Sequence, residues 1–339
     1  MLSKIRSQKI FKDIFRIMSK IKEVNVVKYN KNMQYKLNIT EEDYKICLNL
    51  KKFNKKYNLD IRDIGIKKLD LNDRSLGSDI FPELANLGIK DLIELNLNRN
   101  EIYDLNGLEN ATFKKLETLN LIDNHLSNLN ALNNIKFKRL KNLLLGNNGI
   151  YDIYPLVNVK FKKLEKLWLA SNILNYINVL SQVNFRNLKE LYLGINQIFD
   201  ISIFKDVKFP QLKILNLSFN QIVDISVLGN VNFKELEELY LYNNQISDIN
   251  SLANADFPKL IKLDLSNNSI SDIYVLAKVN FRELKDLNLA SNKIIFLSVF
   301  ERVKFEKMQR LNLKSNLLDK EKESKIISKL KAKIKSFYY

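Results

Sequence analysis

Cysteine and histidine are almost absent from the sequence. Cys47 is the only cysteine in 339 residues, so no intramolecular disulfide can form, which is typical of a protein kept in a reducing compartment. His125 is the only histidine, which excludes a metal site with two imidazole ligands and a second imidazole base. These absences argue against a disulfide-stapled secreted module and against histidine-based catalysis.

Long apolar runs are also missing. No uncharged apolar stretch approaches the roughly 18 residues of a transmembrane helix. Residues 1–20 are interrupted by charges and contain neither an apolar core nor a small-residue cleavage site, so they make a poor signal peptide. Their basic, amphipathic character would also suit a mitochondrial presequence, but Asp13 and the large aliphatic residues that follow favour a retained helix. We therefore expect a cytoplasmic protein without a membrane span.

The positive charge is concentrated at the two ends of the chain. The net charge is +17, and residues 1–65 carry 16 Lys/Arg against 7 Asp/Glu, while residues 317–339 carry 7 against 3. The long middle part is nearly balanced, so its surface does not by itself indicate a polyanionic partner.

A repeat of 24 residues dominates the middle of the sequence. Leucine stands three and five residues before each repeated asparagine, and Ile or Leu stands two residues after it. Leucine also stands eight residues before each asparagine, except that Met308 takes this place in the last copy. The repeated asparagines are Asn100, Asn124, Asn148, Asn172, Asn196, Asn220, Asn244, Asn268, Asn292 and Asn316. Such constant spacing indicates a solenoid in which each coil stacks on the next.

The spacing within each copy predicts the structure of one coil. In Leu-x-Leu both leucines point to one side of a strand, so they face the interior and successive strands stack in parallel about 4.8 Å apart. The inward asparagine can bond backbone groups left unpaired at the bend that follows. A phenylalanine column, also at 24-residue spacing from Phe113 to Phe305, predicts a second buried spine at the back.

The pattern LxxLxLxxNxI is the signature of a leucine-rich repeat. It covers residues 66–318 as about 11 repeats, counting a degenerate first copy at 66–76 in which Arg74 replaces the asparagine. The Asn-x-Ile-x-Asp-Ile continuation resembles the short repeats of internalins and of the protein-phosphatase-1 regulatory subunit. The resemblance implies an α/β solenoid, a curved horseshoe with a parallel sheet on its concave face, helical caps at both ends, and protein binding through the concave sheet.

The two ends of the chain are predicted to be caps. In residues 319–339, apolar side chains recur at helical spacing (Ile326, Ile327, Leu330, Ile334, Phe337), which predicts a C-terminal capping helix; a basic helix on a membrane surface is the alternative.

Residues 1–65 carry a helical pattern at Ile10, Phe11, Ile14, Phe15 and Met18, then the segment VNVVKYNKNMQYKL, then a third element, EEDYKICLNLKKFNKKY. We expect a helical N-terminal cap. The order of these elements also resembles an F-box-like module, which would imply an adaptor of a ubiquitin ligase acting through residues 1–40.

The sequence offers few groups for catalysis. Gly146 and Gly149 precede no Gly-Lys-Ser/Thr and are interpreted as turn glycines, and His125 as an exposed residue at the rim. A column of aspartates (Asp152, Asp200, Asp224, Asp248, Asp272) lacks the oxygen-rich loop of a calcium site and is interpreted as serving turn geometry. We expect no enzyme, no cofactor and no metal.

Outward-facing strand positions are the best candidates for a binding site. The slot between the two strand leucines is polar in the terminal repeats and apolar in the central ones. Clustered aromatic residues with a polar rim are typical of a protein-binding surface, although such side chains can also simply pack on one another. The predicted site consists of Leu144, Trp168, Tyr192, Ile195, Phe219, Tyr240 and Tyr242 on the concave face.

A protein is the expected partner. Aromatic residues beside lysines could also stack nucleic-acid bases, but the lysine-rich runs at 136–141 and 160–166 lie near the phenylalanine turn rather than on the strands. Acidic residues share the concave side (Glu94, Glu117, Glu190, Glu237, Glu238, Asp264). We expect a monomer that binds a protein and not a nucleic acid.

Overall fold

Twelve short strands form a single parallel sheet whose order follows the sequence. The computed structural model describes residues 41–62, 64–303 and 305–339. The strands are β1 Lys68–Asp70, β2 Glu94–Asn96, β3 Thr118–Asn120, β4 Asn142–Leu144, β5 Lys166–Trp168, β6 Glu190–Tyr192, β7 Ile214–Asn216, β8 Glu238–Tyr240, β9 Lys262–Asp264, β10 Asp286–Asn288, β11 Arg310–Asn312 and β12 Ser336–Tyr338. Each leucine pairs with its equivalent one repeat away, as Leu167 does with Leu143 and Leu191. The predicted solenoid is confirmed.

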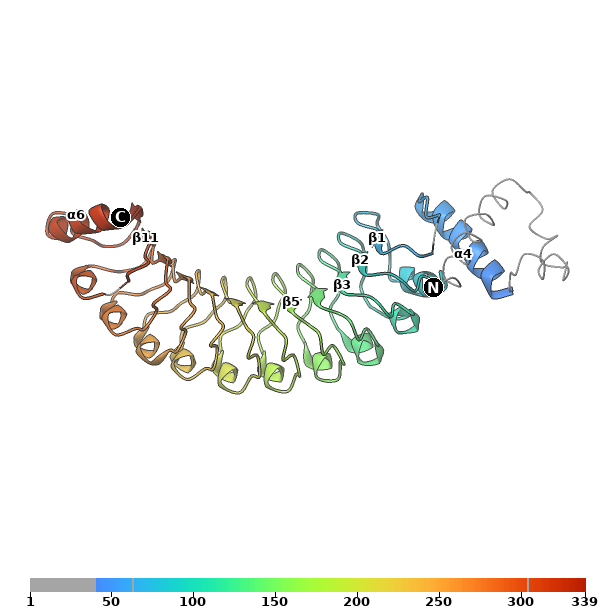
Figure 1. Ribbon diagram of the computed structural model, residues 1–339, viewed down its shortest axis with the longest axis horizontal. Coiled ribbons are helices and arrows are strands. Elements are labelled where there is room, and N and C mark those ends of the chain that lie inside the picture. The colour runs from blue at the N-terminus through green and yellow to red at the C-terminus, as the bar shows by residue number, and fades with distance from the viewer. Residues whose placement is uncertain (1–40, 63, 304) are drawn as a thin grey trace.

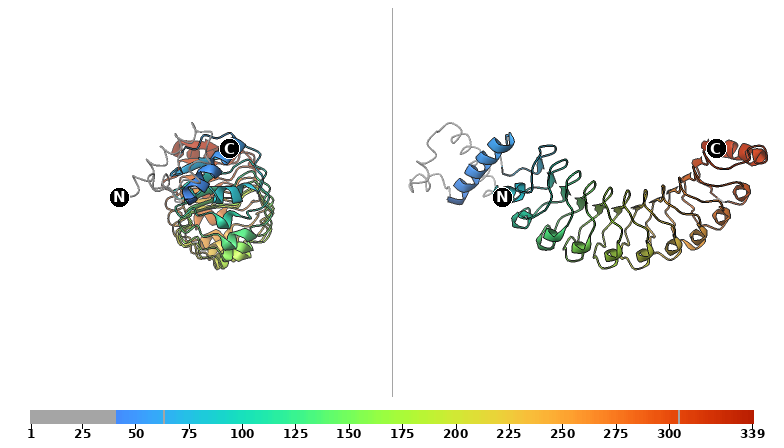
Figure 2. Two further views of the ribbon diagram at one scale, coloured as in Figure 1. Left: turned by 90° about the vertical axis from the view of Figure 1, so that its right-hand side faces the viewer. Right: turned by 180° about the vertical axis from the view of Figure 1, so that it is seen from behind.

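Short 3₁₀ helices return the chain from one strand to the next. They are η1 Leu108–Asn110, η2 Asn130–Asn134, η3 Tyr154–Val157, η4 Asn178–Ser181, η5 Ser202–Lys205, η6 Ser226–Gly229, η7 Asn250–Asn254, η8 Tyr274–Ala277 and η9 Ser298–Glu301. Figure 1 shows the strands along the inner edge of an arc and the 3₁₀ helices along its outer edge. Seen end-on, the coils superpose (Figure 2). The sheet therefore occupies the concave face, as expected.

Apolar side chains fill the interior of every coil. The paired leucines of each strand are buried, and so is the phenylalanine column from Phe113 to Phe305. Some neighbouring phenylalanine rings of this column are in contact. The ring centroids lie 6.1 Å apart for Phe113 and Phe137 and 6.0 Å apart for Phe257 and Phe281. The predicted second spine is confirmed, and it supports the convex side of the coils.

The repeated asparagines join each coil to the one before it. Nδ2 of Asn172 donates to the carbonyl of Leu169 in its own coil and to that of Leu145 in the preceding coil, both at 3.0 Å. Its Oδ1 accepts a bond from the backbone N–H of Ile150, also at 3.0 Å. These bonds satisfy backbone groups that the bend after each strand leaves unpaired, as predicted from the sequence.

A helix covers the first coil. Helix α4, Glu41–Tyr57, coincides with the third predicted element and buries Leu50 and Phe53 next to the short helix α5, Ile80–Ala85. The Arg74 guanidinium donates to the carbonyl of Tyr57, the last residue of α4, at 2.9 Å. Arg74 stands at the position of the repeated asparagine. In the first copy its side chain therefore bonds the cap helix, whereas the asparagine of a later copy bonds the preceding coil. The other predicted N-terminal elements, including the F-box-like residues Phe11 and Phe15, lie outside the described residues.

The C-terminal cap differs in part from the prediction. Helix α6 spans Ser324–Lys333 and buries Ile327 and Leu330. The backbone becomes extended at Ile334, and the next residues form β12, in which Phe337 pairs with Leu311. The prediction of one helix through Phe337 was wrong because Phe337 continues the column of strand leucines and pairs the edge of β11 that would otherwise be open.

The apolar face of α6 packs on the solenoid, which leaves little of it for a membrane surface. Of the helices in the described ranges, none has the length and apolar character needed to cross a membrane.

Candidate protein-binding surface

The sheet places four predicted site residues in one column. Leu144 pairs with Trp168, Trp168 with Tyr192, and Tyr192 with Asn216, which in turn pairs with Tyr240. Strand alternation turns these side chains outward because their neighbours in each strand are the buried leucines. The other three predicted residues, Ile195, Phe219 and Tyr242, follow the strands of the same repeats. We call these seven residues together the concave patch.

Trp168 and Tyr192 form the centre of the concave patch. Their rings stack with centroids 4.2 Å apart and an interplanar angle of 25°. Lys166 lies over both rings, with Nζ 5.1 Å from the Trp168 centroid and 4.9 Å from the Tyr192 centroid, and forms an ion pair of 2.8 Å with Glu190. The side chains are ordered by mutual contact and remain partly exposed, which suits a preformed contact surface.

A second aromatic group lies two strands further along. Tyr240 and Tyr242 contact edge-to-face at 6.4 Å, and Phe219 contacts Tyr242 in the same way at 5.3 Å. Lys262 places Nζ 4.8 Å from the centre of the Tyr240 ring. The structure therefore gathers five of the seven residues into two aromatic groups, Trp168 with Tyr192 and Phe219 with Tyr240 and Tyr242.

Ile195 and Phe219 occupy an unusual backbone position. The residue just before each repeated asparagine has positive φ, which is 54° at Ile195 and 51° at Phe219. In the other coils this position holds Asp, Asn, Ser or, once, Arg (Asp73, Arg99, Asp123, Asn147, Ser171, Asn243, Asn267, Ser291, Ser315). Asn and Asp tolerate the left-handed region, whereas a β-branched or bulky residue is strained there. Both side chains are nevertheless about half exposed, 53% for Ile195 and 47% for Phe219.

Burial and hydrogen bonding affect the ionisation of the patch tyrosines. Partial burial, with Glu190 close by, raises the pKa of Tyr192 to about 12. Burial likewise raises the pKa of Tyr240, whose hydroxyl donates to the Glu238 carboxylate. Both phenols are therefore neutral hydrogen-bond donors at physiological pH.

Two glycines that make room for the concave patch were not recognised from the sequence. A Cβ on Gly146 would lie 2.7 Å from Cδ1 and Nε1 of Trp168, so the indole lies against this glycine. A Cβ on Gly194 would lie 2.9 Å from Oδ1 of Asn216. The interpretation of Gly146 as a turn glycine left out a packing role: its φ is not positive, and its small size makes room for a ring of the next strand. Each glycine stands 22 residues before the outward residue that it contacts, Gly146 before Trp168 and Gly194 before Asn216, and this spacing was the available signal.

Family comparison agrees with the repeat geometry. The model described as Leucine Rich repeats (2 copies) matches residues 186–230 and again 234–278. The chain is a leucine-rich-repeat protein. Repeats of this kind build extended concave surfaces for binding other proteins, so the protein is an interaction scaffold.

Solved structures of bacterial proteins resemble this leucine-rich-repeat protein. Internalin InlF from Listeria monocytogenes is 27% identical, with a TM-score of 0.61 and 80% of each chain covered. A leucine-rich-repeat protein of Leptospira interrogans is 23% identical over 85% of this chain and 74% of its own, with a TM-score of 0.64. The functional domain of InlJ from Listeria monocytogenes is 22% identical over 76% and 51%, with a TM-score of 0.55. The last two likenesses concern the fold alone. No curated protein sequence matches the chain.

The leucine-rich-repeat protein also exposes apolar residues in the segments that follow the strands, including Tyr154 at the start of η3. They lie mainly in the same central repeats: Tyr151, Tyr154, Ile173, Tyr176, Phe199 and Val223 are each 46% to 62% exposed. Tyr176 and Phe199 contact edge-to-face at 5.6 Å. The sequence analysis missed these residues because it considered the strand positions alone; large residues one, three, four and six positions after the asparagine were the signal.

Ion pairs between coils neutralise lysines that stand just before the strands, at the N-terminal ends of the sheet. Lys141 pairs with Glu117 at 2.9 Å, Lys189 with Glu165 at 2.8 Å and Lys213 with Glu237 at 2.6 Å. Each pair spans one repeat, so the charges alternate rather than forming a basic stripe.

The other candidate groups have structural roles in this leucine-rich-repeat protein. Oδ1 of Asp152 and of Asp200 accepts a bond at 2.8 Å from the backbone N–H two residues later, at the start of a 3₁₀ helix, which confirms the turn role. His125 is exposed, as predicted. Within the described ranges, no group of three or more His, Cys, Asp or Glu residues could hold a metal ion.

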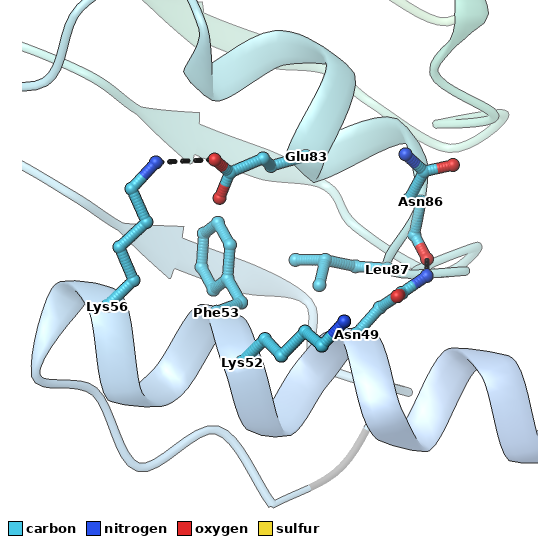
Figure 3. A pocket seen from close by; sticks show the side chains of 7 residues that line it. All are labelled: Asn49, Lys52, Phe53, Lys56, Glu83, Asn86 and Leu87. Atoms are coloured by element: carbon cyan, nitrogen blue, oxygen red, sulfur yellow. Dashed lines mark hydrogen bonds and ion pairs between the residues drawn. The ribbon is translucent and has the colours of Figure 1, made fainter.

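A pocket of about 280 Å³ lies between α4 and α5 (Figure 3). Phe53 and Leu87 form its apolar part, and across it Lys56 and Glu83 form an ion pair of 2.5 Å. The hydrogen bond to Glu83 raises the pKa of Lys56 and keeps it charged. Since the contacts hold the N-terminal helix on the first coil, the pocket is interpreted as part of the cap.

Proposed function

We propose that the protein is a non-enzymatic scaffold that binds another protein through the concave patch. The observation that carries this proposal is the pair Ile195 and Phe219, which are apolar, about half exposed and held at positive φ. Non-glycine residues in this region cost about 1–3 kcal/mol each. Exposed side chains recover little of that cost through burial, so folding stability does not explain their presence.

The neighbouring residues support the same use. Trp168, Tyr192 and Tyr240 are of the types enriched at the centres of protein interfaces, and they are held in place by stacking and cation contacts. A surface that is already ordered loses little conformational entropy on binding. The alternative, mutual packing alone, accounts for the stacked pair and for the contact of Phe219 with Tyr242, but not for apolar residues at the strained backbone positions 195 and 219.

The setting of this scaffold is proposed to be a reducing compartment. Cys47 is buried, and the sequence contains no other cysteine, which supports a cytoplasmic protein. We propose that it acts as a monomer on its partner. The ion-paired lysines support a protein rather than a nucleic acid as the ligand.

Affinity capture with matched variants tests the proposal. The bait proteins are the wild type, a triple variant Trp168→Ala, Tyr192→Ala, Tyr240→Ala, and a control variant Tyr103→Ala, Tyr274→Ala, which removes exposed tyrosines outside the concave patch. We expect partners that are recovered by the wild type and the control and lost from the triple variant, with all three proteins folded by circular dichroism. Equal recovery by the triple variant would place the binding site elsewhere.

The adaptor function predicted for residues 1–40 remains a separate prediction, because Phe11 and Phe15 lie outside the described residues. An adaptor must recover the linker subunit of a ubiquitin ligase in a manner that depends on these two phenylalanines. The captured proteins from a Phe11→Ala, Phe15→Ala variant provide that test.

A further inference from the structure

Strands β6, β7 and β8 carry a symmetric arrangement in the middle of the concave patch. Both β6 and β8 read Glu-Leu-Tyr, and β7 between them reads Ile-Leu-Asn. In register, Asn216 lies between Tyr192 and Tyr240, and Ile214 lies between Glu190 and Glu238. We call the space above β7, between the two tyrosines, the tyrosine slot.

The two walls of the tyrosine slot are supported from outside. Tyr192 stacks on Trp168 of β5, and Lys262 of β9 reaches over Tyr240. Lys166, which contacts Tyr192, also belongs to β5. The cations therefore come from the two strands that flank the β6–β8 group, and the supporting contacts hold both rings in place beside β7.

The floor of the tyrosine slot carries no charge. The outward side chains of β7 are Ile214 and Asn216, and the buried Ser218 follows two residues after the strand. Oδ1 of Asn216 accepts bonds from the backbone N–H and the hydroxyl of Ser218, at 3.0 and 2.6 Å. Gly194 leaves room for this pair, since a Cβ there would lie 2.9 Å from both side-chain oxygens. The floor is thus low and held in one conformation.

Negative charge lies at one end of the tyrosine slot. The Tyr192 hydroxyl donates to Glu190 at 3.2 Å, and the Tyr240 hydroxyl donates to Glu238. Glu190 is paired with Lys166, whereas Glu238 forms no ion pair with any described residue. The charge of Glu238 also contributes to the raised pKa of Tyr192, so its field reaches the opposite wall. Glu238 lies opposite Lys262 in the register of β8 and β9, but no ion pair joins the two among the described residues, so this carboxylate can still receive an incoming cation.

We propose that the tyrosine slot holds an arginine side chain presented by the partner protein. This inference rests on the proposed function and names the chemistry that the patch recognises. Two strand spacings separate the walls by about 9.6 Å, so a group midway lies about 5 Å from each ring, within the roughly 6 Å reach of a cation–π contact. A guanidinium is flat enough to stack between the rings and presents parallel N–H donors to a carboxylate, which a lysine ammonium does not.

Trp168 allows the tyrosine slot to be tested with short peptides. It is the only tryptophan in the chain and stacks on one wall of the slot, so its fluorescence reports occupancy. The probes are acetyl-Gly-Arg-Gly-amide and the same peptide with citrulline, which has nearly the shape of arginine but no charge. We expect a saturable change with the arginine peptide and at least about tenfold weaker binding of the citrulline peptide.

Variants separate recognition of the cation from folding. Glu238→Gln is expected to weaken the arginine peptide at least about tenfold and to leave the citrulline peptide unchanged. Glu94→Gln, the same position in β2, is the matched control and is expected to bind as the wild type does. Tyr240→Phe keeps the ring and should retain binding, whereas Tyr240→Leu should lose it.

The outcomes distinguish this inference from the proposed function. Equal binding of the two peptides, no saturable response by the wild type, or unchanged arginine binding by Glu238→Gln would overturn the assignment of arginine. The affinity-capture experiment is independent of these results, since loss of partners from the triple variant would still place a protein-binding site on the concave patch.

Discussion

The indole of Trp168 lies against Gly146 of the preceding coil, so closely that a methyl group at residue 146 would stand 2.7 Å from the ring. The same indole stacks on Tyr192 of the following coil. The indole of Trp168 is therefore held between two coils: Gly146 leaves the space that it fills, and the Tyr192 ring stacks on it.

Replacing Gly146 by alanine is expected to displace the Trp168 ring without unfolding the solenoid. Tryptophan fluorescence should shift, and binding of the partner should weaken by about tenfold, because the contact surface loses its order. Gly149→Ala is the control, since its Cβ would make an ordinary contact of 3.6 Å with the Leu126 carbonyl oxygen. An unchanged emission spectrum for Gly146→Ala would contradict the close packing.

Replacing Ile195 and Phe219 by asparagine is expected to stabilise the protein while reducing partner binding. Asparagine stands at this position in other coils, including Asn243 and Asn267, and tolerates positive φ. We expect a gain of about 1 kcal/mol for each change in the free energy of unfolding. Chemical denaturation measures the gain, and affinity capture measures the loss; a lower denaturation midpoint for both single variants would show that these residues serve stability.

Phe209→Ala is expected to destabilise the protein by about 3–5 kcal/mol, because it removes a buried ring from the back of a coil. Phe199→Ala is the matched control, since the Phe199 side chain is 47% exposed, and it should cost less than about 1 kcal/mol. Thermal and urea denaturation compare the two variants. Similar midpoints for both would mean that the phenylalanine column is not a spine.

Asn220→Ala is expected to cost about 2–4 kcal/mol, because several backbone groups lose their partners at once. Nδ2 of Asn220 donates to the carbonyls of Leu193 and Leu217 at 3.0 Å, and its Oδ1 accepts from the Ile198 N–H at 2.9 Å. Alanine at the exposed Asn232 is the control. Hydrogen exchange should increase in the coils on both sides of residue 220 and stay unchanged in the distant coils.

Alkaline pH is expected to destabilise the concave patch through Tyr192. Its pKa is about 12 in the folded protein, above the ordinary value of 10.0, so the contribution to stability is complete below pH 10 and is lost as the pH rises toward 12. The phenolate absorbance of wild type minus that of Tyr192→Phe should show a step near pH 12. A step near pH 10 would mean that the ring is fully solvated.

Much of the candidate surface could be predicted from the sequence because strand alternation is a local rule. Trp168 stands between two leucines, so it faces outward wherever the coil is placed. The fate of Phe337 could not be predicted in this way, because helical spacing and continuation of the leucine column are both consistent with its position. The open edge of β11 decided between them, and that edge exists only in the assembled sheet.

The 24-residue period by itself determined the solenoid, the inward leucines, the asparagine bonds and the phenylalanine spine, since each follows from spacing that is the same in every coil. Only the tertiary structure decided which side chains meet across coils: Gly146 under Trp168, two lysines over the aromatic rings, and two tyrosines on either side of Asn216. These contacts depend on ring orientation and on the space left by residues one repeat away. That information lies in the packing of neighbouring coils and not in the pattern within any one of them.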